Sequence, residues 1–313
     1  MFQIAPKKLV IGVVVAGSIA TLAARDMTSA ASQEAARPAL SPVRHVFVGD
    51  MSVGYRIGGQ GPPIVMIIGR SATMAEWDPR LLDRLLRSHR VIVFDNRGVA
   101  TTDDPSKATM TIGQLARDTL GLMTQLRIER ADVLGWSMGG MIAQQVALDA
   151  PGRVVKLVLC STTPGGSHAR RPSLRIQKIL KNPDLSATTL LTLSFPPARA
   201  GVRSAVANGL AVAVQPDLLP DSFTISSATR AHQEEAAARW NSPRGGDYDE
   251  LPSIRARTLV LWGRLDEVEP TYNDRLIVSR VPRAIGQSFA KGGHAFLFQY
   301  PVAVAKVINR FLR

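Results

Sequence analysis

The stretch from residue 131 to residue 149 constrains the fold more than any other part of the chain. An apolar run typical of a strand leads into the pentapeptide GWSMG, and small and apolar residues then recur at helical spacing. Gly135 and Gly139 lack side chains, so a strand and a helix can approach closely around Ser137, whose backbone must be strained. This G-x-S-x-G pattern between a strand and a helix predicts that Ser137 is a nucleophile. The alternative interpretation is a glycine-rich turn in which the serine is incidental.

Composition narrows the classes of protein to which the chain can belong. Its 313 residues are 45% apolar, which is enough to form one large domain or two small ones. The net charge of +13 would favour binding to anionic lipid, an anionic polymer or the cell envelope, but a basic organism or compartment explains the charge at least as well. No nucleic-acid motif accompanies this charge, and we expect no nucleic-acid partner. The single cysteine, Cys160, excludes an internal disulfide.

The N-terminal segment is typical of an export signal. Lys7 and Lys8 precede an apolar run that ends near residue 24, so residues 1–24 are predicted to be a signal peptide. The run is short for a membrane span, and an uncleaved anchor is the second interpretation. A buried helix of a cytoplasmic protein is the third. Residues 25–42 read as a linker. We expect an exported protein, periplasmic or secreted, with membrane association through residues 1–24 if they are retained.

Strand and helix patterns alternate along the rest of the chain. Besides the strand before Ser137, strands are predicted at 45–48, 51–57, 64–68, 90–95, 154–160, 258–262 and 284–289. This alternation predicts a mostly parallel sheet with helices on both faces. The alternation stops between the predicted strands at 154–160 and 258–262, where Leu190, Leu191 and Phe195 belong to helical patterns. We therefore predict a core at 43–164 and 250–313, with a helical cap at 165–249 over the carboxyl ends of the strands.

A serine nucleophile needs a base, and the base needs an acid that orients it. Of the five histidines, His294 is the candidate base because it follows the last predicted strand and two glycines. The loop after the strand at 258–262 offers three acids, of which Asp266 is preferred. Glu267 and Glu269 are expected to face solvent or to form salt bridges. Glu269 remains the alternative acid if the loop folds back.

Several ordered motifs together carry a family resemblance, which extends roughly from residue 45 to the C-terminus. The sequence DNRG at 95–98 resembles a D-x-R-G loop, and the segments around Asp266 and His294 resemble acid and base loops. The chain thus resembles the cap-bearing serine α/β-hydrolases, which include bacterial esterases, C–C bond hydrolases and cofactor-free haloperoxidase-type perhydrolases. The resemblance implies an α/β-hydrolase fold with an eight-stranded, mostly parallel sheet and a helical cap after the sixth strand.

One position departs from the family pattern. The family usually has His-Gly after its third strand, whereas this chain has Ile68-Gly69. By resemblance, the backbone N–H groups of Arg70 and Met138 form the oxyanion hole, a role that does not require the missing histidine side chain. The side chain of Arg70 could also meet an acidic substrate, or it could simply be exposed.

These features predict a hydrolase that cleaves small to medium carboxylic esters through an acyl-enzyme on Ser137. No metal or cofactor is expected. One alternative is C–C bond hydrolysis or perhydrolysis by the same triad. Another is a non-catalytic ligand-binding protein on the same fold, because a fold does not determine a function. The acyl group, the alcohol and the oligomeric state are not determined by the sequence.

Overall fold

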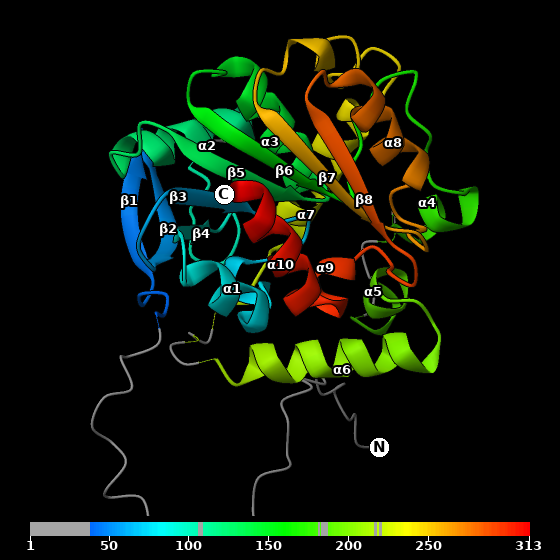
Figure 1. Ribbon diagram of the computed structural model, residues 1–313, viewed down its shortest axis with the longest axis horizontal. Helices are drawn as coiled ribbons and strands as arrows, with labels where there is room; N and C mark the ends of the chain where they lie inside the picture. The colour runs from blue at the N-terminus through cyan, green and yellow to red at the C-terminus, as the bar shows by residue number, and fades with distance from the viewer. Residues whose placement is uncertain (1–37, 106–108, 181, 183–186, 216–217, 219–220) are drawn as a thin grey trace, which may run out of the picture. The chain divides into compact units, whose positions relative to one another are not determined.

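The computed structural model describes residues 38–105, 109–180, 182, 187–215, 218 and 221–313 (Figure 1). The predicted signal peptide or anchor at 1–24 and most of the predicted linker lie outside the described residues. The side chains of Leu190 and Leu191 also lie outside them. No helix in the described part of the chain is long and apolar enough to cross a membrane.

The described residues form one eight-stranded sheet, in which the order of the strands is β1-β2-β4-β3-β5-β6-β7-β8 (Figure 1). Strand β2 pairs antiparallel with both β1 and β4, and all other neighbouring strands are parallel. The mostly parallel eight-stranded sheet confirms the predicted fold class. The bounds are β1 (Arg44–Val48), β2 (Met51–Gly58), β3 (Pro63–Ile67), β4 (Arg90–Phe94), β5 (Ala131–Trp136), β6 (Val154–Cys160), β7 (Arg257–Gly263) and β8 (Ala284–Phe289).

Helices cover both faces of this sheet, because successive residues of the central strands point to opposite sides. In β3, Val65 and Ile67 belong to the apolar cluster that includes helices α2, α3 and α8. Ile64 and Met66 belong to a second cluster with α1, α9 and α10. The bounds are α1 (Pro79–Leu86), α2 (Ile112–Gln125), α3 (Met138–Asp149), α8 (Thr271–Arg280), α9 (Phe296–Gln299), α10 (Pro301–Leu312), and the short 3₁₀ helices η1 (Met74–Glu76) and η2 (Leu251–Ser253).

Helix α2 begins at a local sequence signal. Thr111 caps α2, because its side chain accepts a hydrogen bond from the Gln114 N–H at 3.0 Å. The Gln114 side chain donates to Asp118 at 2.9 Å, so only one half of a capping box forms. In α10, Val304, Ala305 and Ile308 are fully buried against the core, whereas 44% of the surface of Val302 is exposed.

Residues 165–249, the insertion, connect β6 to β7. In their described part they form α4 (Leu174–Leu180), α5 (Ala187–Ser194), α6 (Arg199–Ala213) and α7 (Ser227–Trp240). Phe195 is buried in the cluster that includes α9 and α10, so the insertion packs on the core. The sequence did not predict α6, because most of its large apolar residues face solvent and not the core.

Candidate active site

Ser137 lies in the sharp turn between β5 and α3. Its backbone has φ 56° and ψ −124°, a conformation that residues with a side chain rarely adopt. A Cβ atom on Gly135 would overlap the carbonyl group of Gly139, and one on Gly139 would overlap that of Ile67. The Ser137 N–H donates to the Cys160 carbonyl at 2.9 Å, which ties the turn to β6. The two glycines thus allow the close packing that holds the serine in this conformation.

The structure brings Ser137, His294 and Asp266 together at the carboxyl edge of the sheet. His294 lies between β8 and α9, and Asp266 follows β7. The Nε2 atom of His294 is 2.9 Å from Ser137 Oγ, and its Nδ1 atom is 2.9 Å from Asp266 Oδ2. Since β5 to β8 are neighbouring parallel strands, their carboxyl ends share one edge of the sheet. A hydroxyl, an imidazole and a carboxylate are thereby connected by two hydrogen bonds.

Two neighbours orient the imidazole and the carboxylate. The indole N–H of Trp136 donates to the backbone carbonyl of His294 at 3.0 Å, and the two rings lie 5.3 Å apart. The Asp266 side chain is fully buried. Its Oδ1 atom accepts hydrogen bonds from the N–H groups of Val268 and Glu269, both at 2.8 Å. The backbone of the loop therefore directs the other carboxylate oxygen, Oδ2, at His294.

The two predicted oxyanion donors lie beside this turn. Met138 is the first residue of α3, and the glycine before Arg70 packs so closely that a Cβ on Gly69 would lie 3.1 Å from Ser137 Cβ. Within the described residues, the N–H groups of Arg70 and Met138 have no hydrogen-bond acceptor. Both donors are therefore free to bind an oxygen that carries negative charge.

A residue of the insertion supports the loop that carries Arg70. The N–H of Ser71, which has φ 55°, donates to the side chain of Gln233 on α7 at 2.8 Å. The Arg70 guanidinium is ion-paired with Glu234, also on α7. Burial lowers the pKa of Arg70, and the charge of Glu269 opposes this effect. Of the two alternatives for the Arg70 side chain, full exposure does not occur, because the insertion leaves it only 21% exposed.

A cavity of about 170 Å³ borders Ser137. The core and the insertion both contribute to its lining, which combines charged, polar and apolar side chains: Arg70, Ser137, Met138, Met141, Arg170, Arg171, Pro172, Gln177, Leu180, Glu234, Ala237, Ala238, Asn241, Val268 and Glu269. Among the described residues, no group of three or more His, Cys, Asp or Glu side chains is placed to hold a metal ion.

The three acids of the loop after β7 have different environments. Glu267 is exposed and ion-paired with Arg175 at 2.9 Å, as expected. The expectation that Glu269 faces solvent or forms a salt bridge is wrong, because the loop turns back and buries its side chain. Burial, with a smaller contribution from Asp266, raises the pKa of Glu269 to about 8, although Arg70 opposes the shift. Glu269 is therefore mostly neutral at pH 7.

Comparisons with known proteins agree with this fold. A family model described as alpha/beta hydrolase fold matches residues 62–193. The chain is 29% identical over 262 residues to the 2-hydroxy-6-oxo-6-phenylhexa-2,4-dienoate hydrolase of Comamonas testosteroni, covering 78% of this chain and 85% of that protein. It is 27% identical over 278 residues to the 2-hydroxymuconate semialdehyde hydrolase of Pseudomonas sp. CF600, covering 86% and 93%. The structure of Est816, an N-acyl homoserine lactone degrading enzyme, superposes with a TM-score of 0.69 at 26% identity, covering 86% and 100%.

The chain has the α/β-hydrolase fold, and it resembles α/β-hydrolases in sequence over most of its length. It is a hydrolase, and the site around Ser137 lies at the carboxyl edge shared by the parallel strands β5 to β8. The chemistry of its substrate is a separate question, since relatives of this family act on different bonds.

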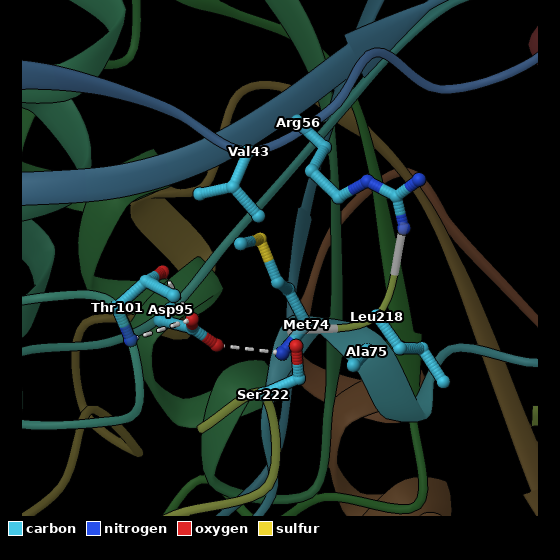
Figure 2. Close-up of a pocket in the computed structure, with 8 residues that line it drawn as sticks. All are labelled: Val43, Arg56, Met74, Ala75, Asp95, Thr101, Leu218 and Ser222. Atoms are coloured by element: carbon cyan, nitrogen blue, oxygen red, sulfur yellow. Dashed lines mark hydrogen bonds between the residues drawn. The ribbon is translucent and has the colours of Figure 1, made fainter. Parts of the chain in front are cut away.

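In this α/β-hydrolase the DNRG segment supports the site without contacting Ser137 in the described structure. Figure 2 shows Asp95 beside a small cavity, where it accepts hydrogen bonds from the Met74 N–H at 2.7 Å and the Thr101 hydroxyl at 2.7 Å. Burial raises the pKa of Asp95, and these donors oppose the shift. Arg97 binds Asp118 through two hydrogen bonds, at 2.8 and 2.7 Å. The motif therefore holds the loops after β3 and β4 in place.

Sequence analysis missed several residues of the α/β-hydrolase site. Gln233 lies 162 positions from Ser71 in the sequence, and no local pattern connects them. Asp274, on α8, accepts a hydrogen bond from the Thr162 N–H at 3.3 Å. Burial, together with Asp266 and Glu269, raises its pKa well above the usual value. The signal that could have found Asp274 is its place one turn into the helix that follows the acid loop.

Proposed function

We propose that this α/β-hydrolase cleaves carboxylic esters of small to medium size through an acyl-enzyme on Ser137. The observation that carries the proposal is the pair of 2.9 Å contacts that connect Ser137 Oγ through His294 to Asp266. His294 is the only one of the five histidines, all of them described, that hydrogen-bonds the serine. A strained serine with a base and an oriented acid is the arrangement required for nucleophilic acyl transfer.

In the first half-reaction, Ser137 Oγ attacks the ester carbonyl carbon while His294 Nε2 takes the hydroxyl proton. The carbonyl oxygen becomes an oxyanion, and the N–H groups of Arg70 and Met138 stabilise it. The tetrahedral intermediate then collapses. The bond to the alcohol oxygen breaks, and His294 returns the proton to this leaving group. Asp266 holds His294 in the tautomer whose Nε2 can accept the proton, and it stabilises the imidazolium.

In the second half-reaction, water attacks the acyl-enzyme while His294 takes one of its protons. A second oxyanion forms in the same hole. The bond to Ser137 Oγ breaks as His294 returns the proton to the serine, and the carboxylic acid is released. No step requires a group that the chain does not supply.

The preference for small to medium esters rests on the cavity and on the insertion, which we propose acts as a cap. The residues of α4 and α7 enclose a cavity of about 170 Å³ next to Ser137. The lining mixes methionine and alanine with arginine, which suits a short acyl chain beside a polar group. The related Est816 degrades N-acyl homoserine lactones, which contain a cyclic ester.

C–C bond hydrolysis is the second candidate, because two relatives are hydrolases of semialdehyde and dienoate compounds. Perhydrolysis by the same triad is a third candidate, and ligand binding without catalysis is a fourth. Parallel assays with aryl esters, vinylogous diketones and peroxide would separate the three reactions. Covalent labelling by a fluorophosphonate probe would contradict a non-catalytic role.

The direct test is the Ser137→Ala variant. Turnover of p-nitrophenyl esters should fall by several orders of magnitude, while the far-UV circular dichroism spectrum and the melting temperature should stay close to the parent values. Labelling by the fluorophosphonate should also be lost. Ester turnover within tenfold of the parent would exclude Ser137 as the nucleophile.

A further inference from the structure

The outer face of α6 is apolar and faces solvent. Four residues spaced four apart, Val202, Val206, Leu210 and Val214, are between 52% and 78% exposed. Residues at this spacing share one side of a helix. Figure 1 shows α6 as a long helix along one margin of the described structure. In a single soluble molecule, an apolar stripe of this kind indicates a binding surface.

The opposite side of α6 holds the helix in this orientation. The Asn208 side chain donates to the Asp78 carboxylate at 2.9 Å. Just beyond the helix, the Gln215 side chain donates to the Ala75 carbonyl, also at 2.9 Å. Asn208 and Gln215 thus tie one side of α6 to the core, where Val212 is also buried, and the stripe that begins at Val202 is left on the outer side.

The charge on α6 favours an anionic partner. The exposed residues Arg199 and Arg203 lie at the N-terminal end of the helix, and no residue from 199 to 213 is acidic. The chain as a whole carries a net charge of +13. Exposed arginines beside an apolar stripe, with no acid on the helix, favour contact with the surface of an anionic membrane.

A second copy of the chain fits the same face poorly. Two antiparallel copies of α6 would leave their arginines without a carboxylate on the partner helix, and two parallel copies would bring the arginines together. The helix has 15 residues and is about 22 Å long. A strip of this length is about 10 Å wide, so it covers roughly 200 Å², well below the ~800 Å² per partner of a stable protein interface.

We propose that the outer face of α6 lies on the surface of an anionic membrane. Val202, Val206 and Leu210 enter the boundary between headgroups and acyl chains, and Arg199 and Arg203 bind lipid phosphates. This contact places the enzyme on the membrane without making lipid its substrate, and it does not depend on the reaction proposed for Ser137.

A local fluorescent label tests the proposal in the full chain. The only native cysteine, Cys160, is fully buried, so a Val206→Cys variant can be labelled selectively with nitrobenzoxadiazole. Val302→Cys is the matched control, because Val302 is an exposed valine on α10. Emission is recorded with phosphatidylcholine vesicles, with and without phosphatidylglycerol. We expect a blue shift at position 206 with phosphatidylglycerol vesicles and none at position 302, whether or not residues 1–24 bind as well.

Three results would overturn the proposal. The first is an unchanged emission at position 206 while the protein sediments with the vesicles. The second is an equal shift at position 302. The third is a shift without vesicles that grows with protein concentration, which would identify a second copy as the partner. In the labelled protein, Arg199→Gln and Arg203→Gln should each weaken vesicle binding about fivefold. Val202→Glu should abolish the blue shift at position 206, and the shift should remain absent at high salt.

Discussion

Replacing Asp266 with asparagine should disable the enzyme, for a reason that the hydrogen bonds make explicit. One oxygen of Asp266 accepts two backbone N–H groups at 2.8 Å, and the other accepts from His294 Nδ1 at 2.9 Å. Asparagine has one oxygen. If that oxygen stays on the two N–H groups, its NH₂ group faces His294 and forces the proton of the imidazole onto Nε2. That nitrogen then cannot accept the proton of Ser137.

The reverse orientation of the asparagine is also unfavourable. Its NH₂ group would then face the N–H groups of Val268 and Glu269, and each buried donor without an acceptor costs about 1–3 kcal/mol. We therefore expect the first orientation and a fall in kcat of about 10⁴, by analogy with the same substitution in serine proteases. This loss corresponds to roughly 5 kcal/mol in the activation free energy.

The assay is steady-state hydrolysis of a p-nitrophenyl ester by Asp266→Asn, Glu267→Gln and Glu269→Gln. Glu267 is exposed, and Glu269 is already mostly neutral at pH 7, so both of these substitutions should change kcat by less than tenfold. Turnover by Asp266→Asn within tenfold of the parent would refute the reasoning. If Glu269→Gln were the more damaging change, the orienting acid would be Glu269.

Three further predictions concern stability, processing and substrate size. Because the pKa of folded Glu269 is raised to about 8 from an ordinary value near 4.5, the folded state keeps a proton that the unfolded state loses, and stability falls as the pH rises between these values. In thermal melts, Glu269→Gln should therefore reduce the loss of stability between pH 5 and pH 8, and an unchanged pH profile would contradict the burial of an ionisable group at this position. N-terminal sequencing of the mature protein should find a start between about Arg25 and Gln33, whereas full-length protein confined to the cytosol would argue against export. Water-soluble esters with short to medium acyl chains should be hydrolysed faster than long triglycerides, and strong activation on emulsions would indicate a lipase instead.

Local sequence patterns determined much of this protein. The strand before Ser137 and the helix after it follow from an apolar run, two glycines and helical spacing, all within residues 131–149. The order of the strands along the chain also implied that His294 and Asp266 lie at the same edge of the sheet as the serine. These predictions succeeded because each depends on neighbouring residues or on the general rule that parallel strands share their carboxyl edge.

Only the tertiary structure decided how surfaces outside those patterns are covered. Glu269 resembles a solvent-facing loop residue in the sequence, yet the turn toward α8 buries it and raises its pKa. Gln233 supports the loop after β3 from a helix far along the chain. Asn208 binds Asp78 of the core and so holds α6 with Val202 and Val206 exposed. Burial and long-range hydrogen bonds depend on which segments meet after folding, and this information is not contained in the spacing of residues along one segment.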